Sequence, residues 1–416
     1  QSYKWQFLER LFLDTARLYG FQEMRTPVFE ETKLFTRSVG DTTDVVQKEM
    51  YSFSDKGGRD LTLRPEGTAG INRAVLQNGL INEALPLKIS YNISCFRNEK
   101  PQAGRFRQFH QLGVEMFGSA SPGADVEVIS FVNDFFAILG IAGLSLEINS
   151  IGCPTCRAAY HTALKQYFSA RVDDLCETCL VRLEKNPMRI LDCKSPVCKE
   201  IAADAPVVLD YLCDDCKQHF EGVKKRLDAL HIEYVVNPHI VRGLDYYTKT
   251  VFEFVSNDIG AQSTVCGGGR YDGLLALLGG SNQPALGFAM GIERLLMVAE
   301  AQNIDIPVPQ PCDLYIASMG DDASILALQL ASDLRNEGFY AECDTMGRSL
   351  KAQMKYADKL SAQFSMVLGD NELQTKNATI KNMETGETAD ISLDDALVKF
   401  LYDDQLQKMT EAFSAE

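Results

Sequence analysis

Two charged stretches that lie close together in the sequence could form a nucleotide site. The first, Cys95–Glu99, ends a predicted strand with Arg97 and Glu99, and a polar loop containing a glycine follows it. At period two, one face of the next strand carries Phe109, Gln111, Gly113 and Glu115. An arginine can bind a phosphate through two N–H groups, and an aromatic ring can stack on adenine. The alternative is a hairpin with a charged rim, and these residues alone leave both interpretations open.

Three later stretches place polar groups beside glycine. Residues 242–247 are Arg-Gly-Leu-Asp-Tyr-Tyr, and Gly267–Gly273 begins with three glycines, which allow a ligand to approach the backbone closely. Ala285–Leu296 is a predicted strand that runs through glycines into a helix, with Arg294 in the first helical turn, a position suited to a phosphate. Each stretch also has a structural interpretation: the tyrosines as core residues and the glycine run as a flexible turn.

Eight of the twelve cysteines fall between residues 153 and 216. They form four short-spaced pairs: Cys153 and Cys156, Cys176 and Cys179, Cys193 and Cys198, and Cys213 and Cys216. Disulfides are a poor explanation in a cytosolic chain, whereas four close pairs suit one or two structural zinc sites with thiolate ligands. The alternative is a set of ordinary thiols, which the sequence alone favours. The cysteines outside this region are expected to be small buried hydrophobic residues.

The elements that must position these residues indicate an α+β catalytic domain over residues 1–303. We expect strands at Leu87–Ser94, Gln111–Phe117 and Thr250–Val255, joined as an antiparallel sheet by long polar loops. A helix ending at Tyr19 precedes a strand through residues 24–28, whose Pro27 indicates a sheet edge or an interface. Between residues 152 and 231, charged helices carry the clustered cysteines, which predicts a helical insertion within this domain.

A second domain is predicted after a proline-containing linker at residues 304–311. Residues 312–416 contain alternating strand and helix signals, which predict a small α/β domain with a mostly parallel sheet. The expected elements are strands at Asp313–Ser318, Phe339–Cys343 and Phe364–Leu368, and helices at Ala323–Glu337 and Leu350–Lys359.

Charge and hydropathy narrow the class of protein. The net charge of -16 argues against a non-specific nucleic-acid binder, but it is compatible with an enzyme that gathers its positive groups in one RNA-binding cleft. Because no apolar run reaches the length of a membrane span, and residues 1–13 form an amphipathic pattern rather than a signal peptide, we expect a cytoplasmic protein without membrane contact.

Taken together, these stretches resemble the signature segments of class II aminoacyl-tRNA synthetases, and specifically of the histidyl-tRNA synthetase family. The helix before Gly20 with the strand near Pro27, the Phe96–Glu99 hairpin and Gly287–Leu296 correspond to the three class II motifs. The segments Arg242–Tyr247 and Gly268–Gly273 are peculiar to the histidine enzymes, and Leu63–Thr68 also matches. The resemblance covers essentially the whole chain, including the insertion. A short family segment that precedes the first helix is expected to be absent from this sequence.

The resemblance implies a class II antiparallel sheet flanked by helices, a C-terminal anticodon-binding domain and a homodimer. It implies that L-histidine is activated with ATP and then transferred to the 3′ end of tRNA(His). By resemblance, Phe109 stacks on adenine, Glu99 lies near its amino group, Arg97 holds the α-phosphate and Arg294 the γ-phosphate. Arg242 stabilises charge that develops at the α-phosphate, and Mg²⁺ binds the other phosphates.

The resemblance also implies a histidine-binding set. The expected ammonium site consists of Glu66, Thr68 and Gln111, and Gly67, Arg97 and Arg242 are further expected histidine-binding residues. Glu115 and Tyr247 are expected to bind the two imidazole nitrogens, with Tyr246 beside them. The loop between the two class II strands implies that Gln102 and Arg107 meet the acceptor end of the tRNA.

Two other classes of protein share this resemblance. One is the synthetase-like regulatory subunit of histidine biosynthesis, which generally lacks the anticodon-binding domain and has altered signature residues. The other is the tRNA-sensing pseudo-enzyme domain of a stress kinase, in which the active-site residues are also lost. The presence of Arg242, Glu115 and Arg294 in their motifs argues against both.

Overall fold

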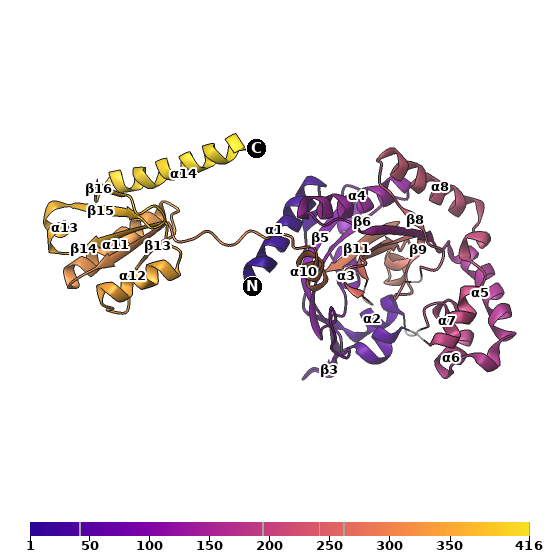
Figure 1. Ribbon diagram of the computed structural model, residues 1–416. Coiled ribbons are helices and arrows are strands. Elements are labelled where there is room, and N and C mark those ends of the chain that lie inside the picture. The colour runs from indigo at the N-terminus through magenta and orange to yellow at the C-terminus, as the bar shows by residue number, and fades with distance from the viewer. Residues whose placement is uncertain (41–42, 194, 241, 261–262, 416) are drawn as a thin grey trace. The chain divides into compact units, whose positions relative to one another are not determined.

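The computed structural model describes residues 1–415 except 41–42, 194, 241 and 261–262. It divides into two compact units, Gln1–Pro307 and Val308–Glu416, and the division lies inside the predicted linker. Figure 1 shows a central sheet with flanking helices in the first unit and a smaller sheet with helices in the second. Each unit is described by itself below.

The first unit is built on an eight-stranded sheet. In spatial order its strands are β1 (Gln22–Glu23), β5 (Leu87–Phe96), β6 (Gln108–Phe117), β11 (Ala285–Gly291), β10 (Thr264–Arg270), β9 (Thr248–Val255), β7 (Ser145–Ser150) and β8 (Val235–Val236). Neighbouring strands are antiparallel except at the two edges, where β1 runs parallel to β5 and β8 runs parallel to β7. The predicted α+β class is confirmed.

Helices cover one face of this sheet. The side chains of each strand point alternately to that face and to the opposite one. In β6, Leu112, Val114 and Met116 point to the face covered by α1 (Ser2–Leu18), α4 (Pro122–Leu139) and α10 (Ile292–Ala301). Phe12 of α1 contacts Phe131 of α4 at a ring separation of 5.5 Å. The intervening residues of β6 therefore face the opposite side of the sheet, where the polar and charged side chains of the candidate site lie.

The strand predicted at residues 24–28 is not present; these residues connect two short strands that belong to different sheets. β1 forms the edge of the large sheet, and β2 (Phe29–Glu31) belongs to a small sheet with β4 (Asp60–Leu63) and β3 (Ser52–Ser54). Pro27 lies between β1 and β2, where the chain leaves one sheet for the other. Because proline has no N–H to donate, it is accommodated at this crossing and not within a ladder.

The insertion follows β7, and its described residues form four α-helices, as its charged amphipathic sequence predicts. They are α5 (Pro154–Ser169), α6 (Glu177–Lys185), α7 (Pro196–Ala203) and α8 (Asp214–Ala229). Pro154 and Pro196 occupy the first helical turn, where a missing N–H costs nothing. Figure 1 shows α5, α6 and α7 grouped at one end of the first unit.

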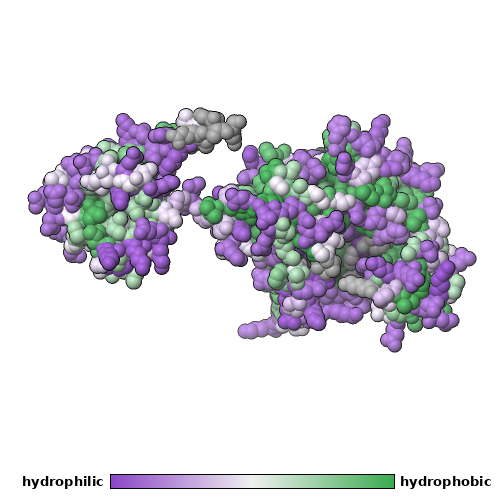
Figure 2. Space-filling view, viewed as in Figure 1, coloured by the Kyte–Doolittle hydropathy of each residue, from purple (hydrophilic) through white to green (hydrophobic). Residues whose placement is uncertain are grey.

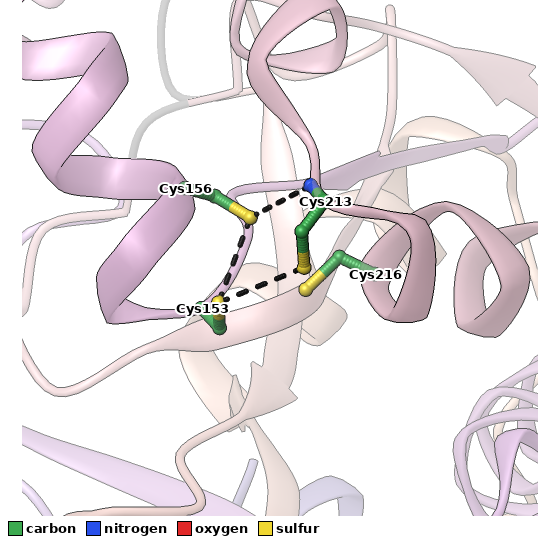
Figure 3. Close-up of side chains that lie close together, drawn as sticks. All are labelled: Cys153, Cys156, Cys213 and Cys216. Atoms are coloured by element: carbon green, nitrogen blue, oxygen red, sulfur yellow. Dashed lines mark hydrogen bonds between the residues drawn. The ribbon is translucent and has the colours of Figure 1, made fainter.

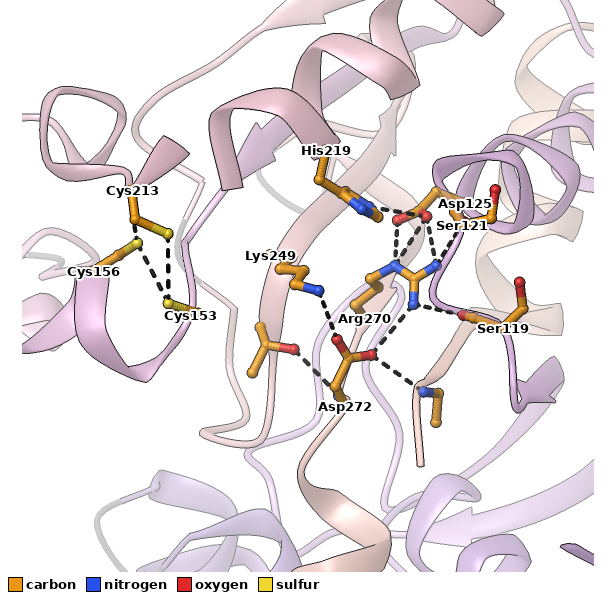
Figure 4. A network of polar contacts seen from close by, with 12 residues as sticks. Ser119, Ser121, Asp125, Cys153, Cys156, Cys213, His219, Lys249, Arg270 and Asp272 are labelled. Atoms are coloured by element: carbon orange, nitrogen blue, oxygen red, sulfur yellow. Dashed lines mark hydrogen bonds and ion pairs between the residues drawn. The ribbon is translucent and has the colours of Figure 1, made fainter. Parts of the chain in front are cut away.

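A buried ionic network ties α8 to the sheet (Figure 4). Arg270 of β10 is 0 % exposed and donates from Nη2 to Asp125 Oδ2 of α4 at 2.8 Å, while His219 of α8 contacts the same oxygen at 3.2 Å. The guanidinium also donates from Nε to Asp125, from Nη1 to Asp272 at 3.3 Å, and to the carbonyls of Ser119 and Ser121, each at 2.9 Å. The guanidinium is therefore desolvated but fully paired.

We expect Arg270→Met to lower the free energy of unfolding of the first unit by about 3–5 kcal/mol, because it leaves Asp125 buried without its main counter-charge. The measurement is calorimetric unfolding of a chain ending at Val308, which contains the first unit without the second. The matched control is Arg59→Met, since Arg59 pairs with Asp55 at the surface, where solvent screening leaves an ion pair little effect on stability. Equal effects of the two substitutions would contradict a stabilising role for the buried pair.

The second unit contains a five-stranded sheet that is parallel in one half only. Its order is β13 (Ala341–Cys343), β12 (Leu314–Ser318), β14 (Phe364–Leu368), β15 (Asn377–Asn382) and β16 (Thr388–Ser392). The first three strands are parallel, but β14, β15 and β16 are antiparallel, so the prediction of a mostly parallel sheet is wrong. The helices are α11 (Asp321–Asn336), α12 (Leu350–Lys359), α13 (Asp370–Thr375) and α14 (Asp395–Ala415). Leu397 and Leu401 of α14 pack into the core of this unit.

The outer surface is largely polar. Figure 2 shows mainly hydrophilic residues on the visible face of each unit, with apolar residues in scattered patches. Within the described ranges, no helix has the length and apolar character required to cross a bilayer.

Candidate active site

A cavity of about 330 Å³ opens on the sheet face opposite α1 and α4, and we call it the Glu115 pocket. It collects residues from β6, β9, β10 and β11 together with three loops. Eleven of the predicted site residues line it: Glu66, Thr68, Arg97, Glu99, Phe109, Gln111, Glu115, Arg242, Tyr246, Tyr247 and Arg294. Segments separated by more than two hundred positions in the sequence therefore line the same cavity.

Glu115 lies at the floor of the pocket and is 1 % exposed. Its Oε1 accepts hydrogen bonds from the hydroxyls of Thr68 at 2.7 Å and Tyr91 at 3.1 Å, and its Oε2 accepts one from Tyr271. Burial raises the pKa of Glu115 to about 8, although the Tyr271 and Thr68 hydroxyls act in the opposite direction. A carboxylate has about four acceptor positions, so three hydroxyls leave one for a ligand.

Two glycines shape the backbone around this carboxylate. A Cβ at Gly287 of β11 would lie 2.0 Å from Glu115 Oε2, and a Cβ at Gly113 of β6 would lie 2.4 Å from the Tyr91 hydroxyl oxygen. Both contacts are far inside van der Waals distance. The polar cluster at the floor therefore requires residues without side chains on the strands beside it.

Glu66 and Thr68 enter the pocket from the start of α3 (Thr68–Gln77). The Glu66 carboxylate accepts from the backbone N–H groups of Thr68 and Ala69, each at 2.8 Å, and burial raises its pKa. Gly67 is buried behind them against the Tyr91 ring and does not line the cavity. Gln111 borders the same region and accepts from the Cys95 thiol at 3.3 Å.

Guanidinium groups enter the pocket from two other segments. Arg97 lies over the Phe109 ring at 5.2 Å, and its Nε donates to the Pro65 carbonyl at 2.9 Å. Arg294, in the first turn of α10, donates from Nη1 to the Thr264 carbonyl at 2.5 Å. Glu99 contacts the Arg105 guanidinium at 3.2 Å. The pocket therefore combines positive side chains with an aromatic ring, as a nucleotide site requires.

Arg242 enters from the loop that precedes β9. Its guanidinium is hydrogen-bonded to Glu253 and lies over the Tyr247 ring at 5.2 Å. Burial alone would lower the pKa of Arg242, but Tyr247 and Glu253 raise it above its ordinary value. The Tyr246 ring packs against Tyr247 at 4.7 Å.

Two predicted residues lie apart from this group, and three residues that support its polar side chains were not predicted. Gln102 and Arg107 are exposed on the β5–β6 loop and do not line the cavity. Tyr91, Tyr271 and Glu253 contact Glu115 or Arg242 directly but were missed. Glu253 interrupts the apolar run Val251–Val255 within β9, and a charge in such a position needs a partner, which is a signal that the sequence offered.

Comparisons with known proteins agree with these observations. The profile described as Histidyl-tRNA synthetase matches residues 1–295, and the profile described as Anticodon binding domain matches residues 313–401. The histidine–tRNA ligase of Acetivibrio thermocellus is 56% identical over 394 residues, which are 95% of this chain and 94% of that protein. The enzyme of Clostridium novyi is 55% identical and covers 94% and 93%.

A solved structure extends the agreement to three dimensions. The crystal structure of apo S. aureus histidyl-tRNA synthetase is 39% identical, covers 96% of each chain and superposes with a TM-score of 0.83. Sequence and fold thus match along nearly the full length, over both units and through the segments that form the Glu115 pocket. The chain belongs to the histidyl-tRNA synthetase family.

Proposed function

We propose that this chain is a histidine–tRNA ligase whose two reaction steps both take place in the Glu115 pocket. Histidine and ATP would form histidyl-adenylate and diphosphate, and the histidyl group would then pass to the 3′ end of tRNA(His). The observation that carries the proposal is one cavity lined both by Arg97, Arg242 and Arg294 and by the buried carboxylates of Glu66 and Glu115. The arginines suit a triphosphate, and the carboxylates suit an ammonium and an imidazole.

ATP is proposed to lie along the Phe109 and Arg294 side of the pocket. Phe109 stacks on adenine and Glu99 accepts from its amino group, while Arg97 binds the α-phosphate and Arg294 the γ-phosphate. The substrate is taken to be the Mg²⁺ complex, since Mg²⁺ favours phosphate oxygens and water as ligands. The existing contact between Arg97 and Phe109 supports this assignment, because it fixes the phosphate-binding and base-stacking groups relative to each other.

Histidine is proposed to bind between Glu115 and Glu66. The one acceptor position left on Glu115 receives an imidazole N–H, and Tyr247 contacts the other ring nitrogen with Tyr246 beside it. Glu66, Thr68 and Gln111 hold the ammonium, with Gly67 allowing the close packing behind them. An amino acid of similar size without the ring N–H would leave the fourth acceptor position of the buried Glu115 carboxylate unfilled, which costs about 1–3 kcal/mol.

The proposed reaction requires little covalent catalysis by the protein. The histidine carboxylate attacks the α-phosphorus in line with the departing diphosphate, so orientation and charge stabilisation set the rate. Arg242 is proposed to act on the α-phosphate as charge builds there, with Glu253 holding its guanidinium in place beforehand. Gln102 and Arg107 are proposed to meet the acceptor end of the tRNA, for which their exposure is suitable.

The test is histidine-dependent exchange of labelled diphosphate into ATP. We expect exchange with L-histidine and none with other amino acids, followed by charging of tRNA(His). A regulatory subunit or a tRNA-sensing pseudo-enzyme would give no exchange. The matched Anticodon binding domain already disfavours the regulatory class, which generally lacks one.

We further propose that residues 1–303 form the catalytic domain and residues 312–416 the anticodon-binding domain, joined by the linker at 304–311. The chain is also proposed to form a homodimer through its first helix and strand. The edge position of β1 supports this, and so do Val28, Phe29 and Phe53, which are 43, 49 and 45 % exposed.

A chain ending at Val308 is expected to retain adenylate formation but to charge tRNA(His) poorly. The Glu115 pocket lies wholly within the first unit, whereas reading of the anticodon is assigned to the second. Diphosphate exchange and tRNA charging are measured side by side, and light scattering reports whether the shortened chain remains a dimer. Unimpaired charging by a dimeric shortened chain would rule out this division of labour.

A further inference from the structure

The eight cysteines of the insertion sort into two separate groups of four. Cys153, Cys156, Cys213 and Cys216 form the first, shown in Figure 3, and Cys176, Cys179, Cys193 and Cys198 form the second. Within each group all four sulfurs lie within 4.8 Å of one another. The pairs are nested: the first and last along the chain meet, and the two middle pairs meet.

The sulfur separations match a tetrahedral metal site and not a disulfide. Cys153 Sγ lies 3.6 Å from Cys156 Sγ and 3.9 Å from Cys213 Sγ, and in the second group Cys176 Sγ lies 3.8 Å from Cys193 Sγ. Four thiolates around zinc at the usual bond length are about 3.8 Å apart, whereas a disulfide brings its sulfurs to about 2 Å. All of these cysteines are free thiols.

Both groups are assembled at helix N-termini. Cys153, Cys176 and Cys213 are the N-cap residues of α5, α6 and α8, and their partners three positions later lie in the first turn. Exposed N–H groups at a helix start favour negative charge, as thiolate ligands require. Backbone N–H groups also donate to the sulfurs of Cys156 at 3.1 Å and Cys198 at 3.3 Å, which orients these ligands as outer contacts do in metal sites.

We propose that the insertion binds two structural Zn²⁺ ions, one in each group of four cysteines. Tetrahedral all-sulfur sites take zinc or iron, and the proposed reaction has no redox step that would need iron. The geometry therefore favours zinc over the ordinary thiols that the sequence alone suggested. The first site joins the start of α5, the first helix of the insertion, to the start of α8, its last helix.

The second site supports the loop that carries Arg242. Between Cys179 and Cys193 the chain forms a turn, Pro187–Ile190, in which the Arg189 guanidinium donates to the Gly243 carbonyl at 2.9 Å and to Asp245 at 2.8 Å. Asn186 donates to the same Asp245 carboxylate at 3.3 Å. Zinc at the second site would fix this turn, and through it the backbone of the Arg242–Tyr247 loop. This positioning role rests on the proposed function, but the metal sites do not.

The test is metal analysis of the full chain produced with zinc available and then desalted. We expect about two zinc ions per chain. Cys213→Ser/Cys216→Ser and Cys193→Ser/Cys198→Ser should each retain one, and the control Cys312→Ser/Cys343→Ser, in the second unit, should retain two. A content of one ion or fewer in the original chain, or iron in place of zinc, would overturn the proposal.

Measurements on the original chain avoid dependence on variants that fold poorly. Exchange of zinc for Co²⁺ should give the intense thiolate-to-cobalt absorption of tetrahedral four-sulfur sites, with two ions per chain at saturation. Chelation should speed hydrogen exchange in residues 186–190 and 243–247 before it does so in β6. Eight thiols that react at once with a thiol reagent in the native chain would contradict the assignment. A chain with two zinc ions but no diphosphate exchange would disprove only the proposed function.

Discussion

Replacing Arg242 by alanine is expected to slow histidyl-adenylate formation by about 100- to 1,000-fold, which is the usual effect of removing one group that stabilises transition-state charge. The affinity for histidine should change much less, because the proposed partner of Arg242 is negative charge that grows only as the reaction proceeds. Rapid-quench measurement of adenylate gives the rate, and equilibrium binding of histidine gives the affinity. Equal losses in both would show that Arg242 binds the ground state.

Two matched variants separate charge stabilisation from disturbance of the loop. Glu253→Gln weakens the existing partner of Arg242, so it reports the effect of a misplaced guanidinium. Arg189→Ala removes another arginine that contacts the same loop but does not line the Glu115 pocket. Arg242→Lys keeps the charge and loses the planar fork, so partial activity is expected. An Arg189→Ala defect as large as that of Arg242→Ala would assign the loss to loop structure.

Glu115→Gln is expected to raise the histidine concentration needed for half-maximal exchange by about 10- to 100-fold, the equivalent of one charge-assisted hydrogen bond. The glutamine would also turn an N–H₂ group toward the hydroxyls of Thr68, Tyr91 or Tyr271, all of which now donate to the carboxylate. The requirement for ATP should stay within about twofold, because no adenosine contact is assigned to this residue.

The reciprocal control is Glu99→Gln, which changes the same functional group elsewhere in the pocket. Its proposed partner is the adenine amino group, so it should raise the ATP requirement and leave the histidine requirement nearly unchanged. Steady-state exchange with each substrate varied in turn measures both. An unchanged histidine dependence in Glu115→Gln would remove this carboxylate from the proposed ring contact.

The shared face of Phe109, Gln111 and Glu115 was predictable because it follows from strand periodicity alone. These residues alternate with Leu112, Val114 and Met116, which the structure packs against the helices of the other face. The position of Arg294 in the first turn of a helix was also predictable, because it depends only on the sequence around that residue. Such predictions succeed where one element determines the direction of its own side chains.

Contacts between distant segments could not be obtained in this way. The hydroxyl of Tyr91 reaches Glu115 from β5 and that of Tyr271 from the residue after β10, and both contacts depend on strand order. The nested grouping of the cysteines likewise depends on how α5 and α8 meet. In the second unit, β15 and β16 were missed because their alternating pattern contains mainly small and polar residues, such as Ala378 and Thr379, which give a weak strand signal.

The glycines beside Glu115 also limit how the ligand preference of this pocket can change during evolution. Gly113 and Gly287 lie in paired strands, β6 and β11, whose backbone position is fixed by the hydrogen bonds of the sheet and changes little when neighbouring side chains are exchanged. Any larger residue there would collide with the Tyr91 hydroxyl or with Glu115 itself. The depth of the cavity is therefore inherited with the sheet, and we expect altered ligand preference in descendants of this sequence to arise among the other lining side chains, such as Tyr246 and Tyr247.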